Sequence, residues 1–432
     1  MQQLIDKLIN KEARLGILGL GYVGLPLAVS YAKAGFQVIG FDLDESKVAG
    51  VNSGDSYIID VPNEQLAEVV QSGKLTATTD FSQLASVDSV NICVPTPLGK
   101  TRDPDISFIQ AAVGSIAASM HSGLLVILES TTYPGTTEEV ILPLLSENGF
   151  QVGKDFFLAF SPERVDPGNP TYHTTNIPKV VGGVTPNCTE VARNLYGQVM
   201  DTVVPVSSVR VAETVKLLEN TFRSVNIGLV NEIALMCSAM DIDVWEVIDG
   251  AATKPFGFMP FYPGPGLGGH CIPIDPFYLS WKAKQAGSEA RFIDLAGQIN
   301  GFMPRHVLKL VTRGLNDRRK SVNGSKVLVV GVAYKPGIDD MRESPALDIL
   351  EMLANLGAET AWYDPHVESL PAGIDCVQLR EWSKVAVGAF DAAVIVTPHP
   401  VVDHSLLLES GPVIIDTRNA LKGYQGPDLI KL

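Results

Sequence analysis

ARLGILGLGYVGLPLAVSYAKAGFQVIGFDLDESKV, residues 13–48, reads as a strand, a glycine-rich turn, an amphipathic helix and a second strand. Gly19, Gly21 and Gly24 form a GxGxxG turn, and Asp42 ends the second strand. This pattern is typical of a dinucleotide site, where the turn and the helix amides approach a pyrophosphate and the acid binds the adenosine ribose. Because the Asp42 carboxylate would repel a 2′-phosphate, the sequence favours NAD over NADP.

The same order of elements recurs in the last third of the chain. Further strands are expected at 88–95 and 123–131, and residues 326–365 repeat the strand, turn, helix and strand, ending beside Asp364. Segments 390–400 and 411–419 then stand where 87–97 and 123–131 stand in the first copy. We interpret this as a degenerate internal duplication.

The second copy has lost GxGxxG and gained AYKPGIDDMRES, which carries Lys335 and Arg342. It is therefore expected to bind a different, phosphate-bearing ligand; a solvated charged loop is the alternative. Residues 211–240 between the copies contain no proline, and as one helix they would span about 45 Å. Such a helix can link two domains and offer an apolar face to a second subunit. Lys216 and Asn220 lie four residues apart, so they share one face of it.

Composition excludes several classes of function. The formal charge of −15 opposes binding to nucleic acid or to an anionic membrane, which requires a basic surface. Five cysteines without a CxxC pair favour reduced thiols over a disulfide framework or a zinc site, and we expect no metal. The N-terminal segment carries acids and amides where a signal peptide needs an apolar run, so a cytoplasmic protein is expected.

One cysteine lies in an unusual loop, GPGLGGHCIPIDP, at residues 264–276. Taken alone, Cys271 could be a metal ligand, half of a disulfide, a buried filler or a nucleophile, and His270 could be its partner or a second ligand. A nicotinamide domain, a second nucleotide-like domain and a cysteine loop between them suggest an oxidation that passes through a covalent thiol adduct.

The motifs that carry this interpretation occur together across the whole chain: GLGYVGLP, CVPTPL, ESTTYPGTTEE, SPERVDPGNP, KLLENTFRSVNIGLVNE, PFGFMPFYPGPGLGGHCIPIDPFY and DDMRESPA. In this order they resemble the UDP-glucose/UDP-N-acetylmannosamine dehydrogenase family. The string around Cys271 is most similar to that of the bacterial UDP-N-acetylglucosamine 6-dehydrogenases of surface-polysaccharide synthesis.

The resemblance implies an α/β fold with two Rossmann-like, doubly wound parallel-sheet domains joined by a long central helix and a helical middle domain. The expected boundaries are an NAD-binding domain at 1–205, a central helical domain with the cysteine loop and dimer interface at 206–310, and a UDP-sugar-binding domain at 311–432. A homodimer or higher homo-oligomer is expected.

The resemblance also implies the roles of individual residues, with Cys271 as the nucleophile. The other implied catalytic residues are Lys216, Asn220, Asp275, Glu163 and Thr131. Lys216 and Asn220 donate to the developing alkoxide, Asp275 holds a water that takes the alcohol proton, and Glu163 and Thr131 orient or activate the hydrolytic water. The implied NAD-binding residues are Gly19, Gly21, Tyr22, Val23, Gly24, Asp42, Pro95, Thr96 and Thr131, and the implied substrate-binding residues are Glu163, Arg164, Lys216, Asn220, Gly268, Lys335, Arg342 and Arg418.

Three departures from the UDP-glucose branch bear on the sugar. Ile274 replaces a lysine, His270 replaces a small polar residue, and Lys254 is the nearest cation to a missing arginine. These changes suit a 2-acetamido sugar, so we expect four-electron oxidation of carbon 6 of UDP-N-acetylglucosamine. The alternatives are the UDP-N-acetylmannosamine, UDP-N-acetylgalactosamine or UDP-glucose enzymes, a two-electron NAD dehydrogenase that needs no thiol, and an NAD-binding scaffold without turnover.

Overall fold

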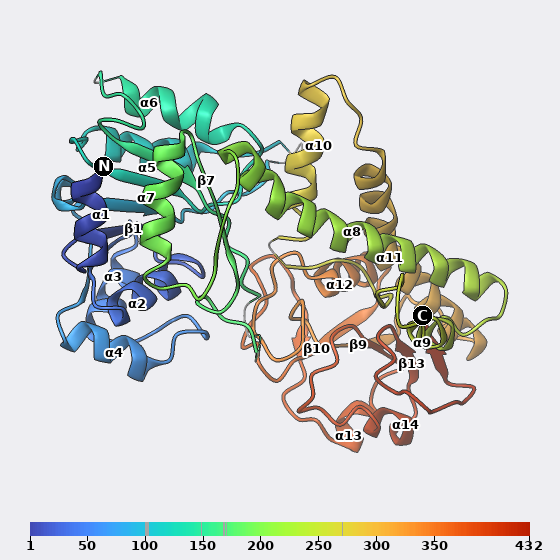
Figure 1. Cartoon of the computed structure of the whole chain (residues 1–432). Helices are drawn as coiled ribbons and strands as arrows, with labels where there is room; N and C mark the ends of the chain where they lie inside the picture. Colours follow the sequence, from blue (N-terminus) through green and yellow to red (C-terminus); the bar gives the residue numbers. More distant parts are fainter. Residues whose placement is uncertain (100–102, 148, 167–168, 170, 270) are drawn as a thin grey trace. The chain divides into compact units, whose positions relative to one another are not determined.

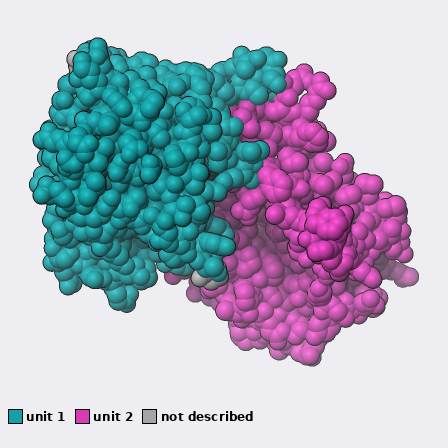
Figure 2. Space-filling view, in the orientation of Figure 1, with its two compact units in different colours: residues 1–219, 281–288 teal, residues 220–280, 289–432 magenta. Residues whose placement is uncertain are grey.

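The computed structural model describes residues 1–99, 103–147, 149–166, 169, 171–269 and 271–432. The chain divides into two compact units, coloured separately in Figure 2. Unit 1 comprises residues 1–219 and 281–288, and unit 2 comprises residues 220–280 and 289–432. Each unit contains one β-sheet. The three domain boundaries expected from the sequence remain a prediction.

The sheet of unit 1 has eight strands in the order β3-β2-β1-β4-β5-β6-β7-β8. The strands are β1 (Arg14–Leu18), β2 (Gln37–Phe41), β3 (Leu75–Thr78), β4 (Ser89–Ile92), β5 (Leu125–Leu128), β6 (Phe157–Phe160), β7 (Lys179–Gly183) and β8 (Val203–Pro205). The first six strands follow the Rossmann order and pair in parallel, as the sequence predicts. The pair β6–β7 departs from an all-parallel sheet because it is antiparallel, and the described residues of the segment that joins the two strands form no crossover helix.

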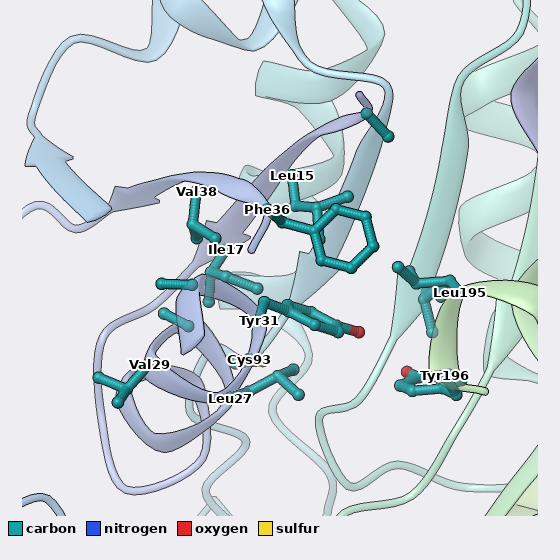
Figure 3. Packing of buried hydrophobic residues seen from close by; sticks show 14 of the residues in the cluster. Leu15, Ile17, Leu27, Val29, Tyr31, Phe36, Val38, Cys93, Leu195 and Tyr196 are labelled. Carbon is teal, nitrogen blue, oxygen red and sulfur yellow. The ribbon is translucent and has the colours of Figure 1, made fainter. Parts of the chain in front are cut away.

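Figure 3 shows how apolar side chains cover one face of this sheet. Leu15, Ile17 and Val38 point from β1 and β2 toward Leu27 and Tyr31 of the helix α2 (Gly24–Lys33). Leu195 and Tyr196, from α7 (Pro186–Tyr196), complete the cluster, and the hydroxyl of Tyr31 points toward that of Tyr196. Unit 1 also contains α1 (Gln2–Ile9), α3 (Glu45–Ser53), α4 (Asn63–Gln71), η1 (Phe81–Ser86), α5 (Ser107–Ala117), the π-helix η2 (Thr137–Ile141) and α6 (Leu142–Ser146).

A long helix is formed where the sequence predicts one: α8 spans Val209–Ala239. It is followed by α9 (Val244–Ala252), α10 (Asp275–Gln285) and α11 (Arg291–Asp317) (Figure 1). Pro304 lies inside α11. These helices form the helical middle region of the fold. Among the described residues, no helix combines the length and the apolar character needed to cross a membrane.

The sheet of unit 2 repeats the topology of the first. Its six strands run in the order β11-β10-β9-β12-β13-β14, and every pair is parallel. The strands are β9 (Lys326–Val330), β10 (Glu359–Tyr363), β11 (Val377–Gln378), β12 (Ala392–Ile395), β13 (Val413–Asp416) and β14 (Leu429–Lys431), and the helices are α12 (Pro345–Asn355), α13 (Lys384–Val387) and α14 (Leu406–Ser410). The shared order agrees with the internal duplication inferred from the sequence.

Candidate active site

The glycine turn after β1 leaves an open position at its centre. Gly19 has φ 91°, and a Cβ there would lie 2.7 Å from the carbonyl oxygen of Cys93. A Cβ on Gly24 would overlap the carbonyl oxygen of Gly19, whereas a Cβ on Gly21 would meet no described atom within 4 Å. Two glycines are therefore required by packing, and the open backbone at Gly21 fits the approach of a pyrophosphate.

The expected ribose acid lies beside this turn. One carboxylate oxygen of Asp42, Oδ2, accepts a hydrogen bond from the backbone N–H of Leu20 at 2.8 Å, and Oδ1 accepts one from Asp44 at 3.0 Å. The Lys47 ammonium lies 3.8 Å from Oδ2. The carboxylate is thereby fixed at the carboxyl end of β2, at the position that a ribose-binding acid occupies.

The remaining predicted cofactor residues lie at the same edge of the sheet. Tyr22 and Val23 belong to the glycine turn, and within the described residues no side chain caps the N-terminus of α2. Pro95 and Thr96 follow β4, and Thr131 follows β5. Because β1, β4 and β5 are parallel neighbours, the segments after them meet at the carboxyl edge.

Glu163 follows β6 and is held by two backbone amides and one ammonium group. Its Oε1 accepts hydrogen bonds from the backbone N–H of Arg164 at 2.7 Å and of Val165 at 2.9 Å. Its Oε2 lies 3.2 Å from the Nζ of Lys179, which also donates to Glu129 at 2.6 Å. Burial raises the pKa of Glu163, but the Lys179 ammonium and the two amides more than offset burial and hold the pKa below its usual value.

Sequence reasoning missed Lys179 and Glu129. Their side chains are 4% and 0% exposed, although each is an ionisable residue flanking an apolar strand. A charged residue at the end of such a run, as in LVILEST and PKVVGG, is the signal that could have identified them.

Arg164, a predicted substrate ligand, forms a two-pronged ion pair within unit 1. Its Nη2 lies 2.6 Å from Oε1 of Glu219, its Nε donates to Oε2 at 3.2 Å, and its Nη1 donates to the carbonyl of Pro178. The pair orients the Arg164 side chain. Contact with substrate stays a prediction for this residue.

A second buried carboxyl missed by the sequence analysis belongs to α8. Glu213 is 1% exposed and accepts hydrogen bonds from the N–H of Gly135 at 2.6 Å, the N–H of Thr137 at 3.0 Å and the hydroxyl of Thr137 at 2.7 Å. Burial raises the pKa of Glu213 to about 7 despite these donors. Lys216, which is 9% exposed, lies one turn further along the same helix.

Three predicted catalytic residues come together in unit 2. The backbone N–H of Asp275 donates to the carbonyl of Cys271 at 2.8 Å, at the point where α10 begins. The Nδ2 of Asn220 donates to Oδ2 of Asp275 at 2.6 Å. Asp275 is 2% exposed and Cys271 is half-buried. His270 lies outside the described residues.

The glycines of the cysteine loop allow it to approach the second repeat closely. A Cβ on Gly264 would overlap the guanidinium of Arg418, and one on Gly268 would lie 2.6 Å from the Cβ of Tyr334. The N–H of Gly269 donates to the carbonyl of Arg342 at 2.9 Å. Gly268 therefore lies against the loop that carries Lys335 and Arg342.

The two arginines of this region differ in their partners. The guanidinium of Arg342 pairs with Asp340, with Nη2–Oδ2 at 2.6 Å. Arg418 is half-buried, and its Nε donates to the carbonyl of Val396 at 3.2 Å. Within the described part of the chain, no carboxylate forms an ion pair with Arg418, and burial lowers its pKa to about 10. A desolvated cation of this kind is suited to an anionic ligand.

The acid of the second repeat is used internally. Oδ2 of Asp364 accepts hydrogen bonds from the N–H groups of Val332 at 2.8 Å and Ala333 at 3.0 Å. It also lies 2.9 Å from Nε2 of His399, whose Nδ1 accepts from the N–H of Gly337, so Nε2 is the donor. With its side chain 0% exposed, Asp364 has no surface for a ribose.

Three successive parts of the chain match the domains of one known protein family. Models of the UDP-glucose/GDP-mannose dehydrogenase family match residues 13–200 with its NAD binding domain, 210–301 with its central domain and 328–423 with its UDP binding domain. The chain is 38% identical over 416 residues to UDP-N-acetyl-D-mannosamine dehydrogenase from Pyrococcus horikoshii, covering 95% of this chain and 96% of that relative.

Two further similarities also cover nine tenths or more of both chains. UDP-N-acetyl-D-glucosamine 6-dehydrogenase from Pseudomonas aeruginosa is 34% identical over 396 residues, covering 90% of this chain and 91% of the relative. A solved structure of the Pyrococcus horikoshii UDP-D-ManNAc dehydrogenase is similar with a TM-score of 0.88 at 36% identity, covering 97% of this chain and 98% of that one.

Proposed function

The chain belongs to the UDP-glucose/GDP-mannose dehydrogenase family, and we propose that it catalyses the NAD-dependent, four-electron oxidation of carbon 6 of a UDP-N-acetylhexosamine to the uronic acid. UDP-N-acetylglucosamine is the proposed substrate. The observation that carries the proposal is the hydrogen-bonded group formed by Asn220 of α8, Asp275 at the start of α10 and Cys271 of the glycine-rich loop.

The reaction requires a nucleophile because a primary alcohol must lose two hydrides to become an acid. NAD held by the turn after β1 and by Asp42 would supply the hydride acceptor for each oxidation, so two NAD would be consumed per product. After the first oxidation, the Cys271 sulfur adds to the aldehyde carbon and the oxygen takes a proton, which gives a thiohemiacetal. Loss of the second hydride and of the hydroxyl proton gives a thioester. Water then forms a bond to the carbonyl carbon, the carbon–sulfur bond breaks, and the sulfur leaves with the electron pair.

The other proposed roles follow from residue type. Asp275 holds the water that takes the alcohol proton, and its contact with Asn220 supports this role by fixing the carboxylate. Asn220 and Lys216 donate to the oxygen of carbon 6 as negative charge develops. Glu163 and Thr131, each at the carboxyl end of a strand, orient or activate the water that cleaves the thioester.

The UDP moiety is proposed to bind in the second repeat. Arg418 is the principal cation, because its guanidinium is desolvated without a carboxylate partner among the described residues. Lys335 and Arg342 contribute on the neighbouring loop, and Gly268 allows the backbone to approach the sugar.

A specific observation favours a second candidate substrate. The relative that is 38% identical is named UDP-N-acetyl-D-mannosamine dehydrogenase, whereas the relative named for UDP-N-acetyl-D-glucosamine is 34% identical. The two sugars differ at one ring carbon. UDP-N-acetylmannosamine is therefore the second candidate.

The assembly and its setting are proposals as well. Exposed apolar side chains form a stripe along α8 at Leu218, Phe222, Leu229 and Met236 and continue to Met240 just after the helix, and a second copy of the chain is proposed to cover it in a homodimer. A reactive thiol at Cys271 requires a reducing compartment, which supports a cytoplasmic enzyme. The uronic acid product is proposed to serve surface-polysaccharide synthesis, including lipopolysaccharide.

A panel of UDP-sugars tests the function. UDP-N-acetylglucosamine, UDP-N-acetylmannosamine, UDP-N-acetylgalactosamine and UDP-glucose are each supplied with NAD, and NADH and uronic acid are quantified. We expect two NADH per acid, with the highest kcat/KM for UDP-N-acetylglucosamine. One NADH per product would contradict the four-electron reaction, and a preference for another sugar would contradict the substrate.

A further inference from the structure

A buried charge network lies behind Glu163 in unit 1. The Lys179 ammonium lies between two carboxylates, 2.6 Å from Oε2 of Glu129 and 3.2 Å from Oε2 of Glu163. The side chains of Lys179 and Glu129 are almost fully buried, and that of Glu163 is 10% exposed. Glu163 is therefore the member of this trio that is most open to a reactant.

At the inner end of the network, both carboxylate oxygens of Glu129 have hydrogen-bond donors. Oε1 of Glu129 accepts from Nδ2 of Asn91 and from the hydroxyl of Tyr196, both at 2.7 Å. Nδ2 of Asn91 also lies 3.2 Å from the Tyr196 hydroxyl and 3.5 Å from that of Tyr31, the two hydroxyls that face each other in Figure 3. With Oε2 occupied by Lys179, Glu129 is locked in place.

The reversal of β7 brings Lys179 to this position. In the antiparallel register of β6 and β7, Ala159 pairs with Gly183 and Phe160 with Gly182. Continuing this register, residue 163 lies opposite residue 179. The first residue of a parallel strand would instead lie at the opposite edge of the sheet.

We infer that Lys179 and Glu129 are positioning residues for the thioester hydrolysis: Glu129 fixes the Lys179 ammonium, and Lys179 holds Glu163 as an oriented carboxylate. This inference deepens the proposed function and rests on it. The carboxylate accepts a proton from water as the water oxygen bonds to the thioester carbon, while the carbon–sulfur bond breaks and the Cys271 sulfur keeps the electron pair.

The charge state of Glu163 follows from the groups that face it. Burial raises the pKa values of Tyr31, Tyr196 and Cys93 well above their ordinary range, so these groups are neutral at neutral pH. Although burial opposes the charge of Lys179, the two carboxylates raise its pKa above the ordinary value, so it remains a cation. Arg164, the residue after Glu163, is neutralised by its ion pair with Glu219. Lys179 is thus the cation that keeps Glu163 ionised.

If Glu129 and Lys179 had only a structural role, a folded variant that lacks both charges would keep the pH dependence of kcat of the wild type. A single Lys179→Met substitution strands two buried carboxylates and can prevent folding. The double variant Glu129→Gln/Lys179→Met removes one charge of each sign, so folding is retained while Glu163 loses its cation. Lys179→Arg keeps the cation, and Lys7→Met is the matched control because Lys7 pairs with Asp88, before β4, at 2.7 Å.

The experiment measures kcat for uronic acid against pH, the KM for NAD, and the sugar–protein adduct by intact-protein mass spectrometry. Because a carboxylate base without its cation takes up a proton more readily, we expect the acid limb of the kcat profile to move to higher pH in the double variant. At about pH 6 its kcat should fall by about tenfold or more, with adduct accumulating and the KM for NAD within about threefold of wild type. Lys179→Arg should restore most of kcat, and Lys7→Met should match wild type.

Contrary results separate the two proposals. If the wild type produces two NADH per acid but the folded double variant keeps the wild-type pH profile and accumulates no adduct, the positioning role is overturned. A proportional loss of kcat at every pH without adduct overturns it too. A wild-type protein that oxidises no UDP-sugar contradicts the proposed function itself.

Discussion

At the scale of single residues, Asp42 and Asp364 show how equivalent acids acquire different uses. Each follows the second strand of its repeat, and each accepts a hydrogen bond at 2.8 Å from the residue two positions beyond the first strand, Leu20 or Val332. His399 then covers the Asp364 carboxylate, whereas Asp42 keeps 12% of its side chain exposed. The equivalence of position could be predicted from sequence; the covering histidine, thirty-five residues from Asp364, could not.

Removing the Asp42 carboxylate tests its contact with the cofactor. Asp42→Ala should raise the KM for NAD by about tenfold to a hundredfold, since a charge-assisted hydrogen bond is worth about 1.5–3 kcal/mol. The same change should relax the rejection of NADP because the repulsion of its 2′-phosphate is lost. Steady-state kinetics with both cofactors measure the effect, with the KM for UDP-sugar as the internal control. An unchanged KM for NAD would show that Asp42 does not bind the ribose.

Because Arg418 and Arg342 differ in their partners, replacing them is expected to weaken UDP-sugar binding to different extents. Arg418→Met should raise the KM for UDP-sugar by about tenfold to a hundredfold, because the anionic diphosphate loses a desolvated cationic partner. Arg342→Met should have a smaller effect, since Asp340 already neutralises that guanidinium. Both should leave the KM for NAD nearly unchanged. Equal effects on the two ligands would contradict the assignment of UDP to the second repeat.

Cys271→Ser separates the two oxidations. A serine hydroxyl is a much poorer nucleophile than a thiol at neutral pH, so acid production should fall by about a thousandfold or more. The first hydride transfer does not need the sulfur, so aldehyde should still form slowly, and binding of NAD and UDP-sugar should stay near wild type. Product analysis with calorimetric binding distinguishes these steps. Two NADH per sugar at the wild-type rate would exclude covalent catalysis by Cys271.

At the scale of elements, local sequence patterns predicted where strands and helices lie, but they did not predict the direction of every strand. The periodic apolar residues of β1, α2 and β2 lie within 13–48, and the helix expected at 211–240 is α8 at Val209–Ala239. The antiparallel β7 was not predicted because direction depends on the path of residues 161–178, which contain no periodic element. The Lys179–Glu163 contact depends on that direction, so it was missed as well.

The Glu213 carboxyl links α8 to Gly135 and to Thr137, the first residue of η2, and this contact is expected to depend on pH. Its pKa is about 7 in the folded protein, against 4.5 for an ordinary glutamate, so the folded state binds a proton that the unfolded chain releases. The stability from this proton is fully present below pH 4.5 and is lost as pH rises through about 7. Relative to Glu213→Gln, the free energy of unfolding of wild type should therefore fall by up to about 3 kcal/mol between these limits.

Denaturant unfolding at several pH values measures this difference. Glu68→Gln, at an exposed position of α4, is the matched control and should run parallel to wild type at every pH. If the Glu213→Gln curve also runs parallel to wild type, the carboxyl does not titrate in this range.

At the scale of the whole molecule, the predicted family, NAD-binding domain and two-sheet architecture are confirmed. The family and the fold could be predicted from the motifs in GLGYVGLP and in the cysteine loop. The residue types of these motifs are fixed by the close approach of a ligand to the backbone and by the chemistry of the reaction. The identity of the sugar depends on one ring carbon, and no residue pattern singled out here distinguishes the epimers.

The apolar stripe on α8 leads to a prediction about assembly. Leu229 is 52% exposed, so Leu229→Glu should leave the fold of the chain intact while placing a charge in the proposed interface. Sedimentation velocity should show a dimer for wild type and a shift toward monomer for the variant. Val385→Glu, at a site 88% exposed on α13, should leave the dimer unchanged. A monomeric wild type would refute the proposed homodimer.

The turns after β1 and β9 show which glycines both repeats share and which glycine is present only in the repeat that is expected to bind a dinucleotide. Gly331 has φ 82° and its N–H donates to Tyr363 at 2.8 Å, as Gly19, with φ 91°, donates to Phe41. The repeat has thus kept the first glycine although its dinucleotide motif is gone. Ala333 occupies the position that Gly21 has in the first copy, and its backbone N–H donates a hydrogen bond to Asp364. In a duplicated fold of this kind, the residue at the second glycine position of the turn therefore distinguishes the repeat that can bind a dinucleotide from the repeat that cannot.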